Sequence, residues 1–179
     1  MDFYPKAFWD TFPQELLAGC PEGLMYSDMF RFNFKQKLNN EFYSKEKDKF
    51  ISDSPFETFE KIIIGLEFQS EKIDYERETI FNMYQAGLHK EHKKRVLTVV
   101  FSMVDDEHKL VKHKVGISDE FTILIISLKA LNQKQTLNNS LNKINNNLYM
   151  SLKEKALFLT SPLMDKTNGL EKLLLLSIC

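Results

Sequence analysis

The feature that most constrains this chain is an apolar, β-branched segment that runs directly into two polar residues. Three consecutive isoleucines at 62–64 favour a strand, and Glu67 and Gln69 follow in the same run. Residues two apart on a strand share one face, so we expect Glu67 and Gln69 to point together. Asp53 lies fourteen positions before Glu67, the separation expected for neighbouring strands of a hairpin. The sequence therefore predicts two carboxylates and an amide at one end of a buried strand.

This constellation resembles the PD-(D/E)XK nuclease superfamily, whose site follows the order D…E-x-K. Asp53 and Glu67 match the two acids, and Gln69 stands where that superfamily usually has lysine. The run Glu67-Phe-Gln-Ser resembles the E-x-Q-S signature of the recombination-promoting nuclease and transposase group, in particular its archaeal members. The similarity covers roughly residues 50–179, and the residues up to Tyr43 match less clearly.

The resemblance implies both a fold class and an activity. The fold would be α/β, with a restriction-endonuclease-like core in which helices flank a mixed β-sheet, followed by a helical C-terminal region. The activity would be that of a metal-dependent DNA endonuclease, which hydrolyses phosphodiesters, associated with recombination or transposition. The alternative is a catalytically inactive protein that keeps the nuclease fold and binds DNA or another partner. An RNA-directed or toxin-like nuclease would use the same site.

The same resemblance assigns roles to individual residues. Asp53, Glu67 and Gln69 would be catalytic, and the metal ligands would be Asp53, Glu67 and the backbone carbonyl of Phe68. The ion would be Mg²⁺ or Mn²⁺, because hard cations prefer oxygen ligands. Gln69 carries no charge at neutral pH, so it could only orient the attacking water by hydrogen bonding. From spacing alone a simpler interpretation stays open, in which Glu67 and Gln69 face solvent on an edge strand and Asp53 is a turn residue.

Contacts with nucleic acid would have to be local, because the net charge of −1 provides no general basic field. The residues expected to contact it are Arg77, Tyr84, Lys93, Lys94 and Arg95. The first two lie two helical turns apart on one face, so both could look toward the sheet. For the three basic residues, a solvated helix end is the simpler interpretation. DNA is the expected partner, and a homodimer stays open.

Length and composition fit a single domain over residues 1–179, with 43% hydrophobic and 27% charged residues. Cys20 and Cys179 form no C-x-x-C pair, which favours a reduced, intracellular protein. The N-terminus lacks the basic head and apolar run of a signal peptide. The longest apolar runs, at 62–66 and 123–126, are far shorter than the ~20 residues that span a bilayer. We therefore expect a cytoplasmic protein that does not enter a membrane.

Hydrophobic periodicity assigns the elements of a core over about residues 30–129. Strands are expected at residues 30–34, 50–56, 61–70, 95–103, 110–115 and 121–128. The second and third would form a hairpin, with Pro55 at an edge, a bulge or a strand end. The polar stretch 35–49 would be an exposed helix or loop. A helix is expected at 74–94, and its apolar stripe would consist of Ile80, Met83, Tyr84, Gly87 and Leu88.

The remaining residues, about 130–179, are expected to form a helical region. Leucine or isoleucine recurs at 137, 141, 144 and 148, which is the spacing of a helix stripe. Ser151 and Glu154 match a capping box that opens a helix through about residue 160. Pro162 would interrupt that helix, and residues 170–178 would form a short apolar helix.

Overall fold

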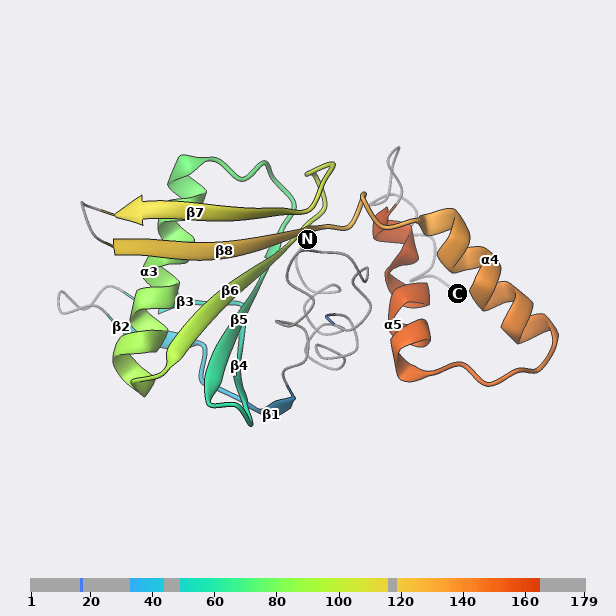
Figure 1. The fold of residues 1–179 in the computed structure, drawn as a ribbon, viewed down its shortest axis with the longest axis horizontal. Helices are drawn as coiled ribbons and strands as arrows, with labels where there is room; N and C mark the ends of the chain where they lie inside the picture. Colours follow the sequence, from blue (N-terminus) through green and yellow to red (C-terminus); the bar gives the residue numbers. More distant parts are fainter. Residues whose placement is uncertain (1–16, 18–32, 44–48, 116–118, 165–179) are drawn as a thin grey trace. The chain divides into compact units, whose positions relative to one another are not determined.

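The computed structural model describes Leu17 and residues 33–43, 49–115 and 119–164. Over these residues the protein is α/β, with a six-stranded mixed sheet, a two-stranded sheet and helices (Figure 1). The chain divides into two compact units. One unit contains Phe32–Ser102 and His108–Ile126, and it holds nearly all of the large sheet. The other contains Met103–Glu107 and the described residues from Ser127 onward.

The large sheet combines antiparallel and parallel pairs. Its strands in chain order are β1 (Phe34–Lys37), β4 (Ser54–Thr58), β5 (Ile62–Gln69), β6 (Arg95–Ser102), β7 (Lys109–Val115) and β8 (Asp119–Ser127). Their spatial order is β1-β4-β5-β6-β8-β7. Successive pairs from β1 to β5 are antiparallel, β5 and β6 are parallel, and β7 and β8 are antiparallel. Helix α3 (Tyr75–His92) joins β5 to β6, because parallel neighbours need a crossover connection. The four strands predicted from residue 61 onward are confirmed, with small shifts at their ends.

The predicted hairpin is confirmed in part: β4 pairs with β5, but the strand predicted at 50–56 is divided, because Lys49–Ile51 form β3 and β4 begins only at Ser54. Its turn is held by Thr58, whose hydroxyl accepts from the Ile62 N–H at 3.2 Å and donates to the Ile62 carbonyl at 3.0 Å. Pro55 is the second residue of β4, and its carbonyl accepts from the Leu38 N–H just beyond the end of β1. The imide nitrogen of Pro55 points to that same side, so the ladder between β4 and β5 loses no hydrogen bond.

Helix α3 confirms the predicted helix and its boundaries. Asp74 is the N-cap, and its side chain accepts from the Arg77 N–H at 2.9 Å. Lys93 is the C-cap in the left-handed region, and its N–H donates to the His89 carbonyl. The predicted apolar stripe is partly wrong, since Met83 is 44% exposed. The buried face is rotated toward Phe81, because that is the face the sheet covers.

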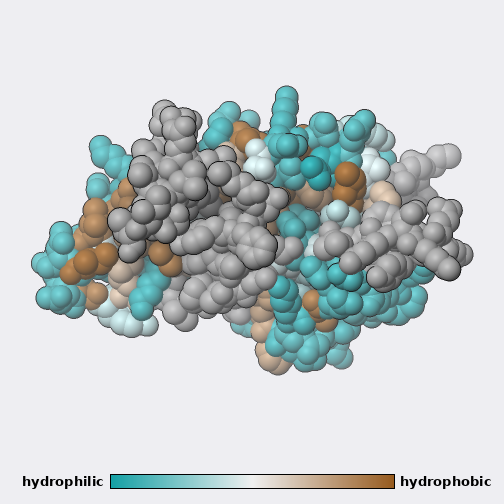
Figure 2. Space-filling model, turned by 180° about the vertical axis from the view of Figure 1, so that it is seen from behind, coloured by the Kyte–Doolittle hydropathy of each residue, from teal (hydrophilic) through white to brown (hydrophobic). Residues whose placement is uncertain are grey.

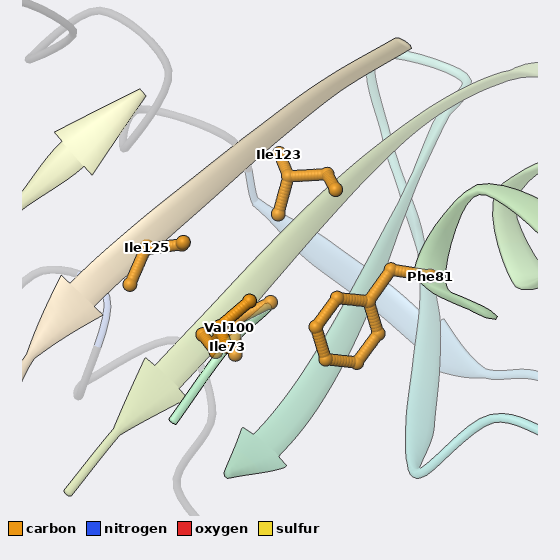
Figure 3. Close-up of a cluster of buried hydrophobic side chains, with 5 residues drawn as sticks. All are labelled: Ile73, Phe81, Val100, Ile123 and Ile125. Carbon is orange, nitrogen blue, oxygen red and sulfur yellow. The ribbon is translucent and has the colours of Figure 1, made fainter. Parts of the chain in front are cut away.

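The core between α3 and the sheet is built from isoleucine, valine and phenylalanine. Its main cluster comprises Ile73, Phe81, Val100, Ile123 and Ile125 (Figure 3). Figure 3 shows the strands that carry Val100 and Ile123, β6 and β8, running in the same direction. On the opposite face of the sheet the side chains are buried as well, including those of Leu66, Val99 and Leu124. Burial on both faces is typical of parallel strands and explains their nearly continuous apolar sequences.

The expectation for residues 35–49 is wrong over the part that the structure describes. β1 extends to Lys37, and β2 (Glu41–Tyr43) pairs antiparallel with β3 (Lys49–Ile51) in a separate two-stranded sheet. Aromatic and β-branched residues within 41–51 favour these strands, although the stretch as a whole is polar. The strand predicted at 30–34 begins only at Phe34, and residues 30–32 lie outside the described part.

In the second unit, α4 (Gln133–Asn145) is followed by α5 (Leu152–Thr160) and the 3₁₀ turn η2 (Ser161–Met164). The capping box is confirmed, because the Ser151 hydroxyl accepts from the Glu154 N–H and the Glu154 carboxylate accepts from the Ser151 N–H. A hydrogen bond from Lys143 Nζ at 2.6 Å, with these capping bonds, lowers the pKa of Glu154 to about 2.

The helix stripe predicted at residues 137, 141, 144 and 148 is not buried in the part of the chain that the structure describes, and α4 ends at Asn145, before Leu148. Leu141, Ile144 and Leu148 are 46%, 47% and 56% exposed. On the face shown in Figure 2, hydrophobic areas are scattered between hydrophilic ones. The helix predicted at 170–178 lies outside the described residues. Among the helices that are described, none has the length and apolar character needed to cross a bilayer.

Candidate metal centre

The hairpin of β4 and β5 places Asp53 directly opposite Glu67. Ser54 pairs with Leu66, and continuing this antiparallel register by one residue pairs Asp53 with Glu67. Two hydrogen bonds cross between them. The Asp53 N–H donates to Glu67 Oε1 at 3.2 Å, and the Phe68 N–H donates to Asp53 Oδ2 at 3.0 Å. Each carboxylate is therefore held by the backbone of the other strand, and both acids lie at the same end of the hairpin.

Ser52 adds a side-chain hydrogen bond to this exchange. Its hydroxyl donates to Glu67 Oε1 at 2.6 Å, and Ser52 itself is completely buried. Glu67 is only 5% exposed. A short bond from a buried hydroxyl to a carboxylate is among the stronger hydrogen bonds in proteins. The Glu67 carboxylate is therefore fixed in a mostly dry environment.

Glu67 and Gln69 face helix α3 rather than solvent. On β5, residues of the same parity as Glu67 share its face, and Ile63 of that set packs against Leu88 of α3. Val100, the partner of Glu67 on β6, packs against Phe81 of α3. Gln69 is the last residue of β5 and is 6% exposed. The edge-strand interpretation is therefore wrong, since β5 lies between β4 and β6 and both side chains are buried.

Tyr84 of α3 packs against the cluster that contains Val100, the β6 partner of Glu67. Burial raises the pKa of the Tyr84 phenol, and the charges of Glu67 and Asp53 raise it further, while Arg77 acts in the opposite direction. The phenol thus remains protonated well above neutral pH and can act as a hydrogen-bond donor.

The backbone carbonyl of Phe68 points toward Asp53. In a strand the N–H and C=O of one residue point to the same side, and the Phe68 N–H donates to the Asp53 carboxylate. β4 begins at Ser54, so this carbonyl faces the segment just before the strand. The Phe68 side chain lies on the other face of β5 and stacks on Phe101, with ring centroids 5.6 Å apart.

The basic residues predicted to contact nucleic acid lie at the opposite end of α3 from Arg77. Lys93 follows Arg77 by sixteen residues, which is about 24 Å along a helix at 1.5 Å per residue. Lys94 Nζ forms an ion pair with Glu57 Oε1 at 2.6 Å, so its ammonium is held against the sheet. Lys93 and Arg95 are exposed. The structure therefore places Tyr84 over the face of the sheet that carries Glu67, and it places Lys93, Lys94 and Arg95 at the C-terminal end of α3.

The donor set can be compared with what different cations require. Among the described residues, no group of three or more His, Cys, Asp or Glu side chains gathers at ligand distance. A structural zinc site, with four protein ligands of nitrogen or sulfur, does not fit this chemistry. Mg²⁺ typically binds one or two carboxylates and keeps several waters, and ligating carboxylates are usually themselves hydrogen-bonded. Asp53 and Glu67, each held by hydrogen bonds, fit that pattern.

The sequence did not indicate that Ser52 belongs to the site. Ser52 lies in a Ser-Asp-Ser-Pro run, and such residues are ordinarily assigned to a turn. The register that places Asp53 opposite Glu67 also places Ser52 opposite Phe68, and that relation was available from the predicted hairpin. The predicted hairpin did not indicate whether Ser52 or Ser54 would reach the Glu67 carboxylate.

Comparisons of the chain with protein-family models, with curated proteins and with solved structures found no match.

Proposed function

We propose that the protein is a metal-dependent DNA endonuclease with a restriction-endonuclease-like core. The observation that carries the proposal is that each acid is held by the other strand: the Asp53 N–H donates to the Glu67 carboxylate, and the Phe68 N–H donates to the Asp53 carboxylate. Glu67 is buried and Asp53 is half-buried, and two acids in direct opposition repel each other, so such an arrangement is costly for stability. A divalent cation between them explains why both are present. A role in recombination or transposition rests on the sequence resemblance alone, and a cytoplasmic location rests on the cysteines, the N-terminus and the short apolar runs of the sequence.

The order of the elements supports the same proposal. Three antiparallel strands, β1, β4 and β5, are followed by α3 and then by β6 parallel to β5. The acids lie at the end of β5 from which the chain leaves for α3. Arg77 lies in the first turn of α3, and Tyr84, near the middle of the helix, packs over the face that carries Glu67. A mixed sheet with a helix over the acidic site is what the resemblance implies.

The residues at the site could each perform a different part of phosphodiester hydrolysis. Asp53, Glu67 and the Phe68 carbonyl would hold Mg²⁺ or Mn²⁺, which when bound neutralises phosphate oxygens and lowers the pKa of a water. The neutral phenol of Tyr84 can donate a hydrogen bond to a phosphate oxygen. Arg77 would add a positive charge on the same face of α3 as Tyr84. Gln69 can orient a water through its amide but cannot take up a proton.

DNA would approach the site from the side of Arg77 and Tyr84. Lys93 and Arg95 lie too far along α3 to contact the same phosphate, but they could contact another part of a duplex. Replacing both by alanine should then weaken binding equally for all DNA sequences. The slope of log K against log salt should become shallower by about one unit for each lost phosphate contact. An unchanged slope would assign both residues to a solvated helix end.

The test is cleavage of supercoiled plasmid by the purified chain. The protein should nick or cut the plasmid with Mg²⁺ or Mn²⁺ and be inactive in EDTA. Glu67→Gln should be inactive, whereas Thr58→Ala, which removes a buried hydroxyl at the other end of the same hairpin, should keep its activity per folded molecule. Equal background cleavage by the wild type and Glu67→Gln would refute the endonuclease. Metal-dependent DNA binding without cleavage would favour the alternative, an inactive protein of nuclease fold.

A further inference from the structure

We infer that Ser52 is a positioning residue that sets the orientation of the Glu67 carboxylate for the divalent cation. The inference rests on the proposed metal site and adds to it a residue outside the D…E-x-Q pattern. Ser52 would not touch the metal, and its effect would pass through Glu67.

The first argument is the position of the hydroxyl. It donates to Glu67 Oε1 at 2.6 Å, the same oxygen that accepts from the Asp53 N–H at 3.2 Å. Both donors therefore approach one carboxylate oxygen from the side of β4. Two donors on a single oxygen fix the rotation of the whole carboxylate, and with it the direction of Oε2. A ligating carboxylate needs this kind of support to hold its geometry.

The second argument is that the hydroxyl itself is held in place. The Ser52 N–H donates to the Asn40 carbonyl at 3.0 Å, which ties residue 52 to the segment just before β2. Ser52 is completely buried, so its side chain has little freedom to rotate. The two-stranded sheet of β2 and β3 is thereby connected to the metal centre through one backbone bond and one hydroxyl.

The third argument concerns electrostatics. Asp53 and Glu67 are both acids, and Glu67 is nearly excluded from solvent. Without a cation, the dipoles that point at Glu67 offset part of the mutual repulsion. An alanine at position 52 would remove the stronger of the two hydrogen bonds. The carboxylate would then be free to turn away from Asp53, and the two acids would no longer present their oxygens to one ion.

A purely structural role for the Ser52 hydroxyl predicts something different. Its loss would then lower the free energy of unfolding without a specific effect on metal affinity. Thr58 is a matched control, because it is completely buried in the same hairpin and its hydroxyl donates to the Ile62 carbonyl at 3.0 Å. Thr58→Ala removes both hydrogen bonds of this hydroxyl with the Ile62 backbone without touching Asp53 or Glu67.

The experiment measures Mn²⁺ binding to the full chain by the loss of the free-ion signal in electron paramagnetic resonance. We expect Ser52→Ala to raise the Kd by about 10–100-fold, the usual effect of removing a partner of a metal ligand. Ser52→Thr, which keeps the hydroxyl, should bind more tightly than Ser52→Ala. Thr58→Ala should bind as the wild type does. If the added methyl of threonine prevents folding, Ser52→Cys keeps the size with a weaker donor and should give an intermediate Kd.

The possible outcomes separate this inference from the proposed function. If the wild type binds no Mn²⁺, or if Glu67→Gln binds as well as the wild type, the metal site itself is refuted and the inference fails with it. If binding depends on Glu67 but Ser52→Ala matches the wild type, only the positioning role is refuted. The same conclusion follows if Thr58→Ala loses as much affinity as Ser52→Ala.

Discussion

Replacing Glu67 by glutamine should leave the metal-free protein as stable as the wild type, or more stable. Two unit charges 4 Å apart repel by about 4 kcal/mol at an effective dielectric constant near 20, which bounds the repulsion that Glu67→Gln removes. Glutamine keeps a carbonyl oxygen that can accept from the Ser52 hydroxyl and the Asp53 N–H. Each of these bonds weakens by about 1–1.5 kcal/mol when its acceptor becomes neutral. The two bonds together lose about 2–3 kcal/mol, so the variant is about 1–2 kcal/mol more stable if the repulsion reaches its bound, and unchanged if the repulsion is about 2–3 kcal/mol.

The assay is thermal unfolding in EDTA and again with excess Mn²⁺. For a chain of this length, 1 kcal/mol shifts Tm by about 2–4 °C, so Glu67→Gln should unfold between the wild-type Tm and about 8 °C above it in EDTA. At a free ion concentration 100 times its Kd, Mn²⁺ should stabilise the wild type by about 2.7 kcal/mol. The variant should gain almost nothing. With Mn²⁺ added, the wild type should therefore become as stable as Glu67→Gln, or more stable.

Two results would contradict this reasoning. A loss of more than about 2 kcal/mol in EDTA would mean that Glu67 is held for stability, because the repulsion with Asp53 would then be smaller than its hydrogen bonds. Equal stabilisation of both proteins by Mn²⁺ would place the ion elsewhere.

Three further predictions concern other contacts. In Glu67→Gln the pKa of Tyr84 should fall but stay above 10, because burial, the largest cause of the raised pKa, remains. Absorbance titration near 295 nm, corrected with Tyr84→Phe, measures this pKa. The hydrogen bond from Lys94 lowers the pKa of Glu57 below its usual 4.5. The stability that this hydrogen bond contributes is therefore present above pH 4.5 and is lost as the pH falls through the lowered pKa. Lys94→Met should therefore be less stable at pH 7 in urea unfolding, and the difference should shrink in acid. Glu154→Ala should lower stability by about 1 kcal/mol through loss of the capping box, with Mn²⁺ affinity unchanged.

The main part of the site could be predicted because it depends on local geometry. The alternation along β5 assigns Glu67 and Gln69 to one face, and a short hairpin leaves few registers that could oppose Asp53 to Glu67. The same pattern could not identify Ser52, because a shift of one residue would have brought Ser54 to the carboxylate instead.

The rest depended on contacts between distant parts of the chain. The sequence places Lys94 in a basic run that is expected to be solvated. In the structure its ammonium donates a hydrogen bond to Glu57, a buried acid 37 residues away. The buried face of α3 is set by the strands beneath it, so the apolar spacing alone placed Met83 in the core and gave Phe81 no role. The pairing of β2 with β3 involves very short strands within a polar stretch, where hydrophobic periodicity carries little information.

The most direct test of the metal site is the anomalous scattering of Mn²⁺ in crystals of the full chain. The account predicts an anomalous peak within about 2.1 Å of one carboxylate oxygen from Asp53 and one from Glu67, with waters completing the coordination. The peak should be absent from crystals of Glu67→Gln. A wild-type crystal with Mn²⁺ bound only at other residues, or an Asp53 and Glu67 pair that stays free of metal at saturating Mn²⁺, would contradict the account.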